Sequence, residues 1–210
     1  MTGMLCADKI VSISRFNKGE ANRIFKEVKD FGTKIVFKNN MPECVLISPE
    51  QYEELMESII DYELYIQAME RLNDTNSKIY SSEEVERMLG LSEWWGDLMP
   101  SGKECFAVKY HEAAVKDLKK LDSYVAKRVI QKINEVAENP LPISEGGKGL
   151  PLGHKMGLDL TNLLKVKLRG LGMRAVYRLE RTEHSMTIVV VGVRKDEEVY
   201  KEALKRIKNK

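Results

Sequence analysis

The chain has 210 residues, of which 43% are hydrophobic, and its 34 Lys and Arg nearly balance its 32 Asp and Glu. This length and apolar content allow one large domain or two small ones. No run approaches the roughly 18 consecutive apolar residues of a transmembrane helix, so we expect no membrane association. The first residues, MTGMLCADKIV, lack the apolar core of a signal peptide, and we therefore expect a cytoplasmic protein.

The charges are unevenly distributed along the chain. Residues 1–49 carry a net charge of +3, residues 50–100 carry −10 and residues 101–210 carry +9. An acidic middle between two basic ends indicates separate domains. Opposite charge blocks on one chain attract each other, and the basic parts predict an acidic partner, with nucleic acid as the first candidate.

The cysteines and histidines predict neither a disulfide framework nor a metal site. Both sets lack the spacing of a common metal-binding motif, and the number of cysteines is odd. We therefore expect no metal and no cofactor. The residues are Cys6, Cys44, Cys105, His111, His154 and His184.

The first 72 residues predict a β-α-β-β-α unit. Alternating apolar residues predict a short strand over residues 10–14, and the spacing of Asn17 and Glu20 is typical of a helix start. Apolar residues at helical spacing follow, and Gly32 favours the end of that helix.

A hairpin and a long helix complete this unit. Two strand-like runs, 34–38 and 43–48, flank the turn sequence NNMP. Ser48 followed by Pro49 is a typical helix start, and the helix is predicted to extend to about Leu72. A unit of this size buries little apolar surface, so we expect it to form a homodimer or a higher even oligomer.

Residues 73–104 are predicted to connect two domains. The sequence SSEE at 81–84 starts a short helix that ends at Gly90. The stretch 91–104 contains Gly, Pro and Ser without periodicity and is typical of a linker.

Residues 105–210 predict a second domain, of order β-α-α-β-β-β-α. Two amphipathic helices are expected to cover one face of an antiparallel sheet and to leave the other face partly open. The whole chain is therefore predicted to be an α+β protein. The strands are expected over 105–110, 162–168, 173–179 and 186–192, and the last helix over about 196–208.

Two of these strands carry a row of cations. Side chains alternate along a strand, so Lys165, Lys167 and Arg169 share one face, and the tight turn that follows brings Arg174 close to Lys167. Arg178 lies further along the second strand. Like charges opposite each other destabilise a hairpin, and no acidic residue of the hairpin offsets the row. A solvated surface is one interpretation; a surface that binds phosphate is the other.

The sequence KVKLRGLGMRAVYRLE, followed by VVVGVRKDEEVYKEALKRI, closely resembles the RelE family of ribosome-dependent mRNA-cleaving toxins. The resemblance covers about residues 105–209 and implies a metal-independent RNA endonuclease that acts on mRNA at the ribosome. One position departs from the family pattern, because Asp196 stands where a basic residue is usual. The resemblance implies catalytic roles for Lys165, Lys167, Arg174, Arg194 and Tyr200 and RNA contacts for Arg169 and Arg178.

The implied reaction is attack of an RNA 2′-OH on the adjacent phosphate, which gives a 2′,3′-cyclic phosphate and a 5′-OH. By this resemblance Tyr200 is the general base, and Lys165 and Lys167 favour its phenolate. Arg174 holds the transition-state phosphate, and Arg194 acts at the leaving oxygen.

The N-terminal sequences ISRFNKGEANRIFKEV and KIVFKNNMPECVLISPEQYEEL resemble the Phd/YefM antitoxin family. This resemblance implies a homodimer that binds operator DNA and represses its own operon. Arg15, Lys18 and Lys38 fall in the segments that match DNA-contacting parts. Solvated surface cations are the alternative interpretation of these three residues.

Together the two resemblances predict an antitoxin fused to its own toxin, with an antitoxin domain over 1–72, a toxin-wrapping segment and linker over 73–104 and a toxin domain over 105–210. Residues 78–90 are our candidate for the segment that blocks the active face, and Met99 is a possible internal start. Two alternatives are a DNA-binding repressor with a catalytically inactive toxin half and a ParE-type gyrase inhibitor.

Overall fold

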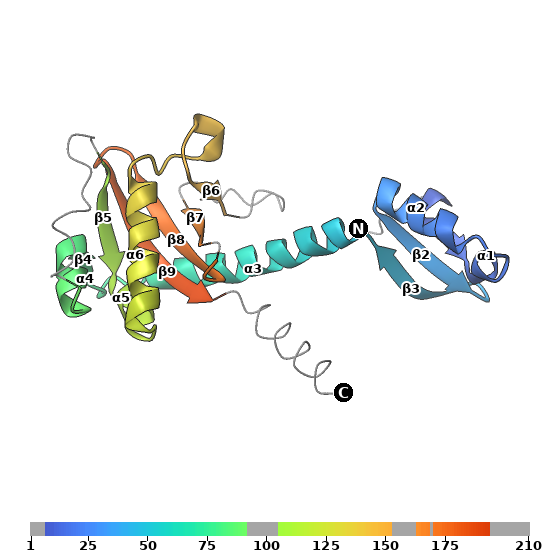
Figure 1. Ribbon diagram of the computed structural model, residues 1–210, viewed down its shortest axis with the longest axis horizontal. Coiled ribbons are helices and arrows are strands. Elements are labelled where there is room, and N and C mark those ends of the chain that lie inside the picture. Colours follow the sequence, from blue (N-terminus) through green and yellow to red (C-terminus); the bar gives the residue numbers. More distant parts are fainter. Residues whose placement is uncertain (1–6, 92–104, 153–162, 169, 194–210) are drawn as a thin grey trace. The chain divides into compact units, whose positions relative to one another are not determined.

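The computed structural model divides the chain into two compact units, Met1–Ile59 and Ile60–Lys210, and each is considered by itself (Figure 1). The boundary lies inside a long helix, whereas the sequence analysis placed the domain boundary after residue 72. No helix of the described part of the chain is long and apolar enough to span a membrane. The structure describes residues 7–91, 105–152, 163–168 and 170–193.

The N-terminal unit is built around a three-stranded sheet of order β1-β2-β3. β1 is parallel to β2, and β2 is antiparallel to β3. The predicted order of strand, helix, hairpin and helix is confirmed, with one additional short helix, α1. The elements are η1 (Ala7–Lys9), β1 (Ile10–Ser12), α1 (Ile13–Asn17), α2 (Ala21–Phe31), β2 (Thr33–Lys38), β3 (Met41–Ile47) and the start of α3 (Pro49–Leu72).

The predicted helix start at Asn17 is wrong. α1 ends at Asn17, and α2 begins at Ala21. Glu20 precedes α2 but makes no capping hydrogen bond with its side chain. Its carboxylate instead accepts a hydrogen bond from Arg15 Nε at 2.8 Å, so the expected capping pattern gives way to an ion pair.

The turn of the hairpin and the start of α3 follow from local sequence. Asn39 and Asn40 adopt positive φ values of 48° and 62°, which a two-residue hairpin turn requires and asparagine tolerates. Ser48 Oγ accepts a hydrogen bond from the backbone N–H of Gln51 at 3.2 Å. The predicted cap at Ser48 is therefore confirmed.

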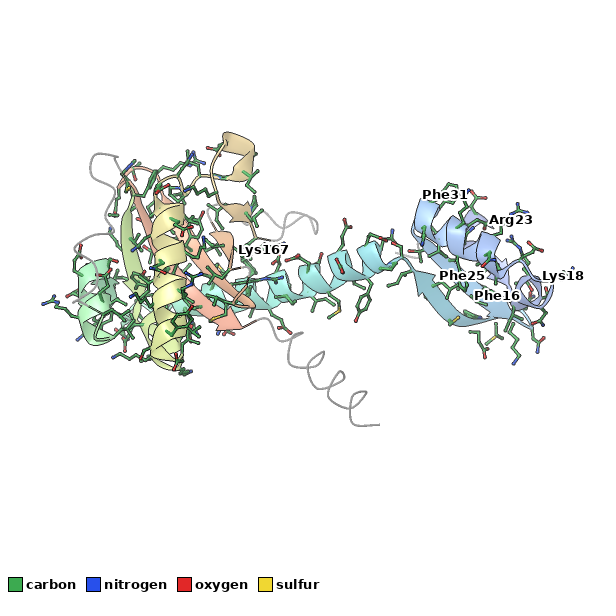
Figure 2. All side chains as sticks on the ribbon, in the orientation of Figure 1. Phe16, Lys18, Arg23, Phe25, Phe31 and Lys167 are labelled. Atoms are coloured by element: carbon green, nitrogen blue, oxygen red, sulfur yellow. The ribbon has the colours of Figure 1, made fainter. Side chains whose placement is uncertain are left out.

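The core of the N-terminal unit is small. Val11, Ile24 and Val36 are buried, and three partly buried apolar residues pack against them. Phe16 and Phe25 meet edge to face with ring centroids 6.2 Å apart (Figure 2). Several large apolar side chains stay exposed, namely Phe25, Phe31, Met41 and Val45.

The C-terminal unit contains a six-stranded sheet of order β4-β5-β9-β8-β7-β6. The predicted sequence of strands and helices from residue 105 to β9 is confirmed, except that a short strand, β6, lies in the stretch predicted to be a loop. Its elements after α3 are β4 (Ile79–Ser81), α4 (Ser82–Met88), β5 (Ala107–His111), α5 (Glu112–Lys119), α6 (Ser123–Ala137), η3 (Ile143–Glu145), β6 (Leu150–Pro151), β7 (Leu163–Leu168), β8 (Met173–Glu180) and β9 (Ser185–Val193). The predicted last helix lies outside the described residues.

The sheet is mixed, so the expectation of a purely antiparallel sheet is wrong. β5 pairs with β9 in parallel, whereas the other pairs are antiparallel. The reason is topological: α5 and α6 return the chain to the end of the sheet where β5 began. Two hairpins then follow, and the last strand runs in the direction of β5.

Helices cover both faces of this sheet. Leu164, Val166 and Leu168 point toward the core that contains the buried residues of α5 and α6. Leu163, on the opposite face, packs with Leu64 of α3. Figure 1 shows α6 crossing in front of β8 and β9, with the C-terminal part of α3 passing behind them. The expectation of a partly open second face is therefore wrong where α3 lies.

Residues 79–91 extend the sheet at its edge. The strand β4, which sequence analysis did not predict, pairs antiparallel with β5. Ser81 and Glu84 form a reciprocal capping box at the start of α4, which confirms the predicted helix start. Val85 and Leu91 then join the core formed by α5 and α6.

Candidate functional site

The predicted row of cations is positioned by the register of β7 and β8. Lys167 lies directly opposite Arg174, and Lys165 lies opposite Val176. The lysines alternate with leucine and valine side chains that enter the core under α6, so they must project from the other face. The predicted proximity of Lys167 and Arg174 is confirmed. We call Lys165, Lys167 and Arg174 the cationic face.

Two members of the cationic face are buried. Lys165 and Arg174 are each only 4% exposed, whereas Lys167 is half-buried. A charged side chain is rarely this buried without a partner, because removing it from water is costly. The sequence analysis treated these residues as an accessible surface, and in the structure two of them are not accessible.

The partner comes from α3, more than a hundred residues earlier in the chain. Lys165 Nζ donates to Asp61 Oδ1 at 2.5 Å and also contacts Asp61 Oδ2. Arg174 Nη1 lies 3.9 Å from Asp61 Oδ1. Asp61 itself is 7% exposed. The prediction that no acidic residue offsets the row is wrong: Glu180 of β8 pairs with Arg178, and the carboxylate of Asp61 from α3 pairs with Lys165.

Apolar packing holds α3 over the same face. Asp61, Leu64 and Ala68 are the buried residues of the helix, and their spacing places them on one side of it. Leu64 and Ala68 pack on residues of three strands and on one residue that follows β6, namely Leu163, Val176, Val189, Val190 and Leu152. A register shift opposite Val176 and Tyr177 allows both Val189 and Val190 of β9 to join this cluster.

A second ion pair anchors the C-terminal end of α3. Arg71 binds Asp117 of α5 through both terminal nitrogens, at 2.5 and 3.1 Å. Arg71 Nη1 also donates to the carbonyl oxygen of Val189 at 2.8 Å, and Asp117 accepts from the backbone N–H of Val191 at 3.2 Å. The pair therefore links α3, α5 and β9.

The remaining predicted site residues of the second domain are not all placed. Arg178 is exposed, and its guanidinium binds Glu180 at 2.5 and 3.0 Å, so it lies on the same strands but is engaged by a neighbour. Arg169, Arg194 and Tyr200 lie outside the described residues, as does Asp196. The position of the expected general base therefore stays a prediction.

Another tyrosine of the recognised motif has a structural role. Tyr177 is buried, and its hydroxyl donates to the carbonyl oxygen of Pro140 at 2.6 Å. Burial raises the pKa of Tyr177 well above its ordinary value, because the phenolate is poorly solvated there. Tyr177 is therefore neutral near pH 7 and positions the loop that follows α6.

The predicted DNA-binding cations of the first unit differ in their surroundings. Arg15 forms ion pairs with Glu20 and Glu27, and these carboxylates raise its pKa. Lys18, at the end of α1, and Lys38, at the end of β2, are exposed. The two lysines are thus accessible to an acidic partner, whereas Arg15 is held within its own unit.

Sequence analysis missed both α3 residues that hold the helix to the sheet. The signal for Asp61 was its spacing, three residues before Leu64 and seven before Ala68, which places a carboxylate in the apolar stripe of an amphipathic helix. Nothing in the sequence alone pairs Arg71 with Asp117. In the described part of the chain, no three His, Cys, Asp or Glu side chains are grouped so as to hold a metal ion.

Comparison with known proteins places the C-terminal part of the chain. The family model of the ParE toxin of the type II toxin–antitoxin system parDE matches residues 108–200. The mRNA interferase toxin RelE of Escherichia coli (strain K12) is 32% identical over 102 residues, which span 49% of this chain and 97% of that protein.

Solved structures of RelE are also similar to this region. The isolated E. coli RelE toxin is 32% identical over 49% of this chain and 98% of that chain, with a TM-score of 0.37. A mutant of E. coli RelE in complex with an antitoxin RelBc peptide is 30% identical over 46% of this chain and 90% of that chain, with a TM-score of 0.34. Through its C-terminal region, about residues 108–200, the chain belongs to the ParE/RelE-type toxins of type II toxin–antitoxin systems.

Proposed function

We propose that the chain is a toxin–antitoxin fusion in which a latent mRNA endonuclease is held inactive by residues 60–72 of the same polypeptide. The observation that carries the proposal is the burial of Lys165 and Arg174 beneath α3, with Asp61 between them. A phosphodiester cannot reach these two cations until α3 moves. This burial supports the proposal that the full chain is inactive while α3 covers the sheet.

The chemistry of the cationic face suits RNA cleavage without a metal. Arg174 offers a planar fork of N–H donors to the phosphate, and Lys165 and Lys167 offer compact positive charges. Together they stabilise the charge that develops on the phosphate as a 2′-OH attacks it. Tyr200 is the proposed general base and Arg194 the proposed donor at the leaving oxygen, with Arg169 and Arg178 as RNA contacts. DNA has no 2′-OH and is not a substrate.

Fusion makes inhibition efficient. Because α3 and the sheet are parts of one chain, their contact is intramolecular, and its effective concentration is of millimolar order for a short flexible connection. E. coli RelE has been solved with a separate antitoxin peptide. In this chain, the peptide that neutralises the toxin is proposed to be the helix already joined to it.

The N-terminal unit is proposed to dimerise and to bind operator DNA for autorepression. Its exposed apolar side chains, Phe31 and Val45 among them, provide surface for a second copy. Exposed Lys18 and Lys38, with Arg15 nearby in sequence, are the proposed phosphate contacts. An operator complex that depends on them weakens steeply with salt, since each phosphate contact releases a counterion.

Two alternative functions are each supported by one observation. The buried Lys165 and Arg174 are compatible with a repressor whose toxin half no longer cuts RNA. The match to the ParE toxin model is compatible with a gyrase inhibitor. A supercoiling assay and a cleavage assay on the same preparation separate these alternatives from the mRNA endonuclease.

The test displaces α3 within the full chain. Leu64→Glu combined with Ala68→Glu places two carboxylates against the apolar cluster and should drive α3 from the sheet. We expect growth arrest and cuts in translated mRNA that end in 2′,3′-cyclic phosphate. Adding Arg174→Ala to this variant should abolish both effects.

Hydrogen exchange provides the control for this test. Amides of residues 60–72 should lose protection in the double variant, whereas amides of α6 and β8 should keep theirs. Absence of RNA cleavage from a variant with that exchange pattern would contradict the endonuclease proposal.

A further inference from the structure

We infer that Asp61 is an internal substitute for the substrate phosphate, so that α3 and an RNA phosphodiester compete for the same two cations. This inference rests on the proposed function and adds the mode of regulation. It differs from simple steric covering, because it assigns the inhibition to one carboxylate. It also predicts that the substrate itself helps to open the site.

The first support is the chemistry of the contact. Asp61 presents two anionic oxygens to Lys165, and one of them lies 3.9 Å from Arg174 Nη1. Lysine and arginine are the side chains that proteins use to bind phosphate, lysine as a point charge and arginine as a fork. A carboxylate between them presents the same kind of oxygen that a phosphodiester presents.

The second support is the asymmetry of that contact. The carboxylate is close to Lys165 but beyond hydrogen-bond distance from Arg174 Nη1. A phosphate has more oxygens, arranged around a larger central atom, and is able to reach both cations at once. A phosphate therefore offers Arg174 Nη1 a contact at hydrogen-bond distance that the Asp61 carboxylate does not make.

The third support is burial. Asp61, Lys165 and Arg174 are all less than a tenth exposed. A buried ion pair contributes little net stability but is costly to break by removing one partner, because the other charge stays desolvated. A helix that needed only to cover the sheet would do so with an apolar residue at position 61. An anion at this position matches the charge of the cationic face.

The two ends of the α3 segment respond differently to a competing anion. Arg71 binds Asp117 and Val189, neither of which belongs to the cationic face. Phosphate should therefore displace the helix at residues 60–63 and leave residues 68–72 in place. Opening is expected to begin at Asp61.

The experiment compares the full chain with two variants in thermal unfolding. Asp61→Asn removes the carboxylate charge with little change in shape. Glu70→Gln is the matched control, because it removes one negative charge from an exposed position of the same helix. The probe is inorganic phosphate, titrated against chloride at constant ionic strength.

We expect phosphate to raise the Tm of the Asp61→Asn variant and to bind it at least about tenfold more tightly than it binds the original chain or the Glu70→Gln variant. Adding Arg174→Ala to Asp61→Asn should remove this gain. Equal phosphate affinity in the Asp61→Asn and Glu70→Gln variants would overturn the inference. So would a gain that survives Arg174→Ala.

A second measurement needs no variant and covers the case in which Asp61→Asn does not fold. Hydrogen exchange of the original chain should speed up at residues 60–63 in phosphate relative to chloride, and not at residues 68–72. Unchanged exchange at 60–63 would overturn the inference.

Failure of the inference and failure of the proposed function are distinguishable. If phosphate binds alike to all variants while the α3-displaced chain cuts mRNA, α3 inhibits by covering alone and the inference is wrong. If Asp61→Asn gains phosphate affinity but the displaced chain cuts no mRNA, the anion competition stands and the endonuclease function does not.

Discussion

The two units of the chain differ in how much of their apolar surface they bury. In the described part of the N-terminal unit only four apolar residues are buried, and large side chains such as Phe31, 73% exposed, remain on the surface. The C-terminal unit has two apolar clusters, one on each face of its sheet. The second unit thus buries apolar side chains on both faces of its sheet, whereas the first has a smaller core and apolar surface that a partner can bury.

The helix α3 shows the same contrast within one element. Tyr52, Leu55 and Ile59 are exposed in its first half, and Leu64 and Ala68 are buried in its second half.

The ion pairs of the two units differ in their exposure in the same way. Arg15 and its glutamates are partly exposed, whereas Asp61 and Lys165 are buried. Exposed pairs contribute little to stability, and buried pairs are costly to break.

The largest expected effect is that of Arg71→Ala. Its removal leaves the Asp117 carboxylate, whose side chain is 13% exposed, with only the backbone N–H of Val191 among the contacts described above. We expect the free energy of unfolding to fall by as much as about 3–5 kcal/mol, the cost of removing one partner of a buried pair, because the side chains of Arg71 and Asp117 are mostly shielded from water. Chemical denaturation of the full chain measures this loss.

The matched change in the N-terminal unit is Arg15→Ala. Arg15 is more exposed than Arg71, and water screens its two ion pairs, so its removal should cost much less than the removal of Arg71. Equal losses for the two variants would contradict the contrast drawn between the units.

The next effect compares a buried and an exposed apolar residue. Ile130 is 0% exposed in the core under α6, and Ile130→Ala should cost about 2–5 kcal/mol through the cavity that it leaves. Phe31→Ala should change stability by less than about 0.5 kcal/mol in a monomer, since most of the ring already contacts water.

Sedimentation at a defined protein concentration tests the comparison of Phe31 with Ile130. If the N-terminal unit dimerises through Phe31, the Phe31→Ala variant should have a lower sedimentation coefficient than the original chain at micromolar concentration. The Ile130→Ala variant should sediment like the original chain. A large loss of stability from Phe31→Ala without any change in assembly would show that the N-terminal core is larger than the buried residues indicate.

Local patterns were sufficient to predict most elements of the fold. Asparagines at the hairpin turn, Ser48 before α3 and Ser81 before α4 each act through bonds within a few residues. The opposition of Lys167 and Arg174 also followed from strand alternation and a short turn. These predictions succeeded because the interactions that decide them are close in sequence.

The missed features are decided by residues far apart in the chain. The strand β4 exists because β5 offers it an edge, and the parallel pairing of β5 and β9 depends on the path of two helices. Burial of Lys165 depends on Asp61, which lies on another element. The sequence therefore predicted which cations share a face, but not that a helix of the same chain covers them.

A smaller effect is expected at Gly149. A Cβ atom added there would lie 2.1 Å from the hydroxyl oxygen of Tyr177 and 3.0 Å from the backbone oxygen of Pro140. Gly149→Ala should therefore destabilise the C-terminal unit by about 1–3 kcal/mol, the usual cost of overpacking.

A double-mutant cycle tests this cause. Tyr177→Phe alone removes the hydrogen bond to Pro140 and should also destabilise. The combined Gly149→Ala and Tyr177→Phe variant should lose less stability than the sum of the two, because the phenylalanine leaves room for the added methyl group. Strict additivity of the two losses would show that the clash is not with the Tyr177 hydroxyl.

The smallest expected effect is a pH dependence that belongs to the C-terminal unit, since residues 1–59 contain no histidine. His111 is buried at the start of α5, and its Nδ1 accepts a hydrogen bond from the backbone N–H of Ala113 at 3.2 Å. Burial lowers its pKa, and the charge of Arg71 acts in the same direction, whereas a hydrogen bond with the backbone of Arg71 and the charges of Asp74 and Glu112 oppose this shift. A protonated ring would lose the capping bond.

The sign of the effect follows from these contacts. Because the pKa of His111 is lower in the folded chain than the value of about 6.5 in the unfolded chain, the unfolded chain binds more protons below that pH. Stability should be full above about pH 6.5 and fall as the pH drops through the folded pKa. His111→Asn keeps a capping oxygen and does not titrate, so its unfolding free energy should change less between pH 7 and pH 5. Denaturation at both pH values measures this, and an equal loss in the original chain and the variant would assign the acid sensitivity to another group.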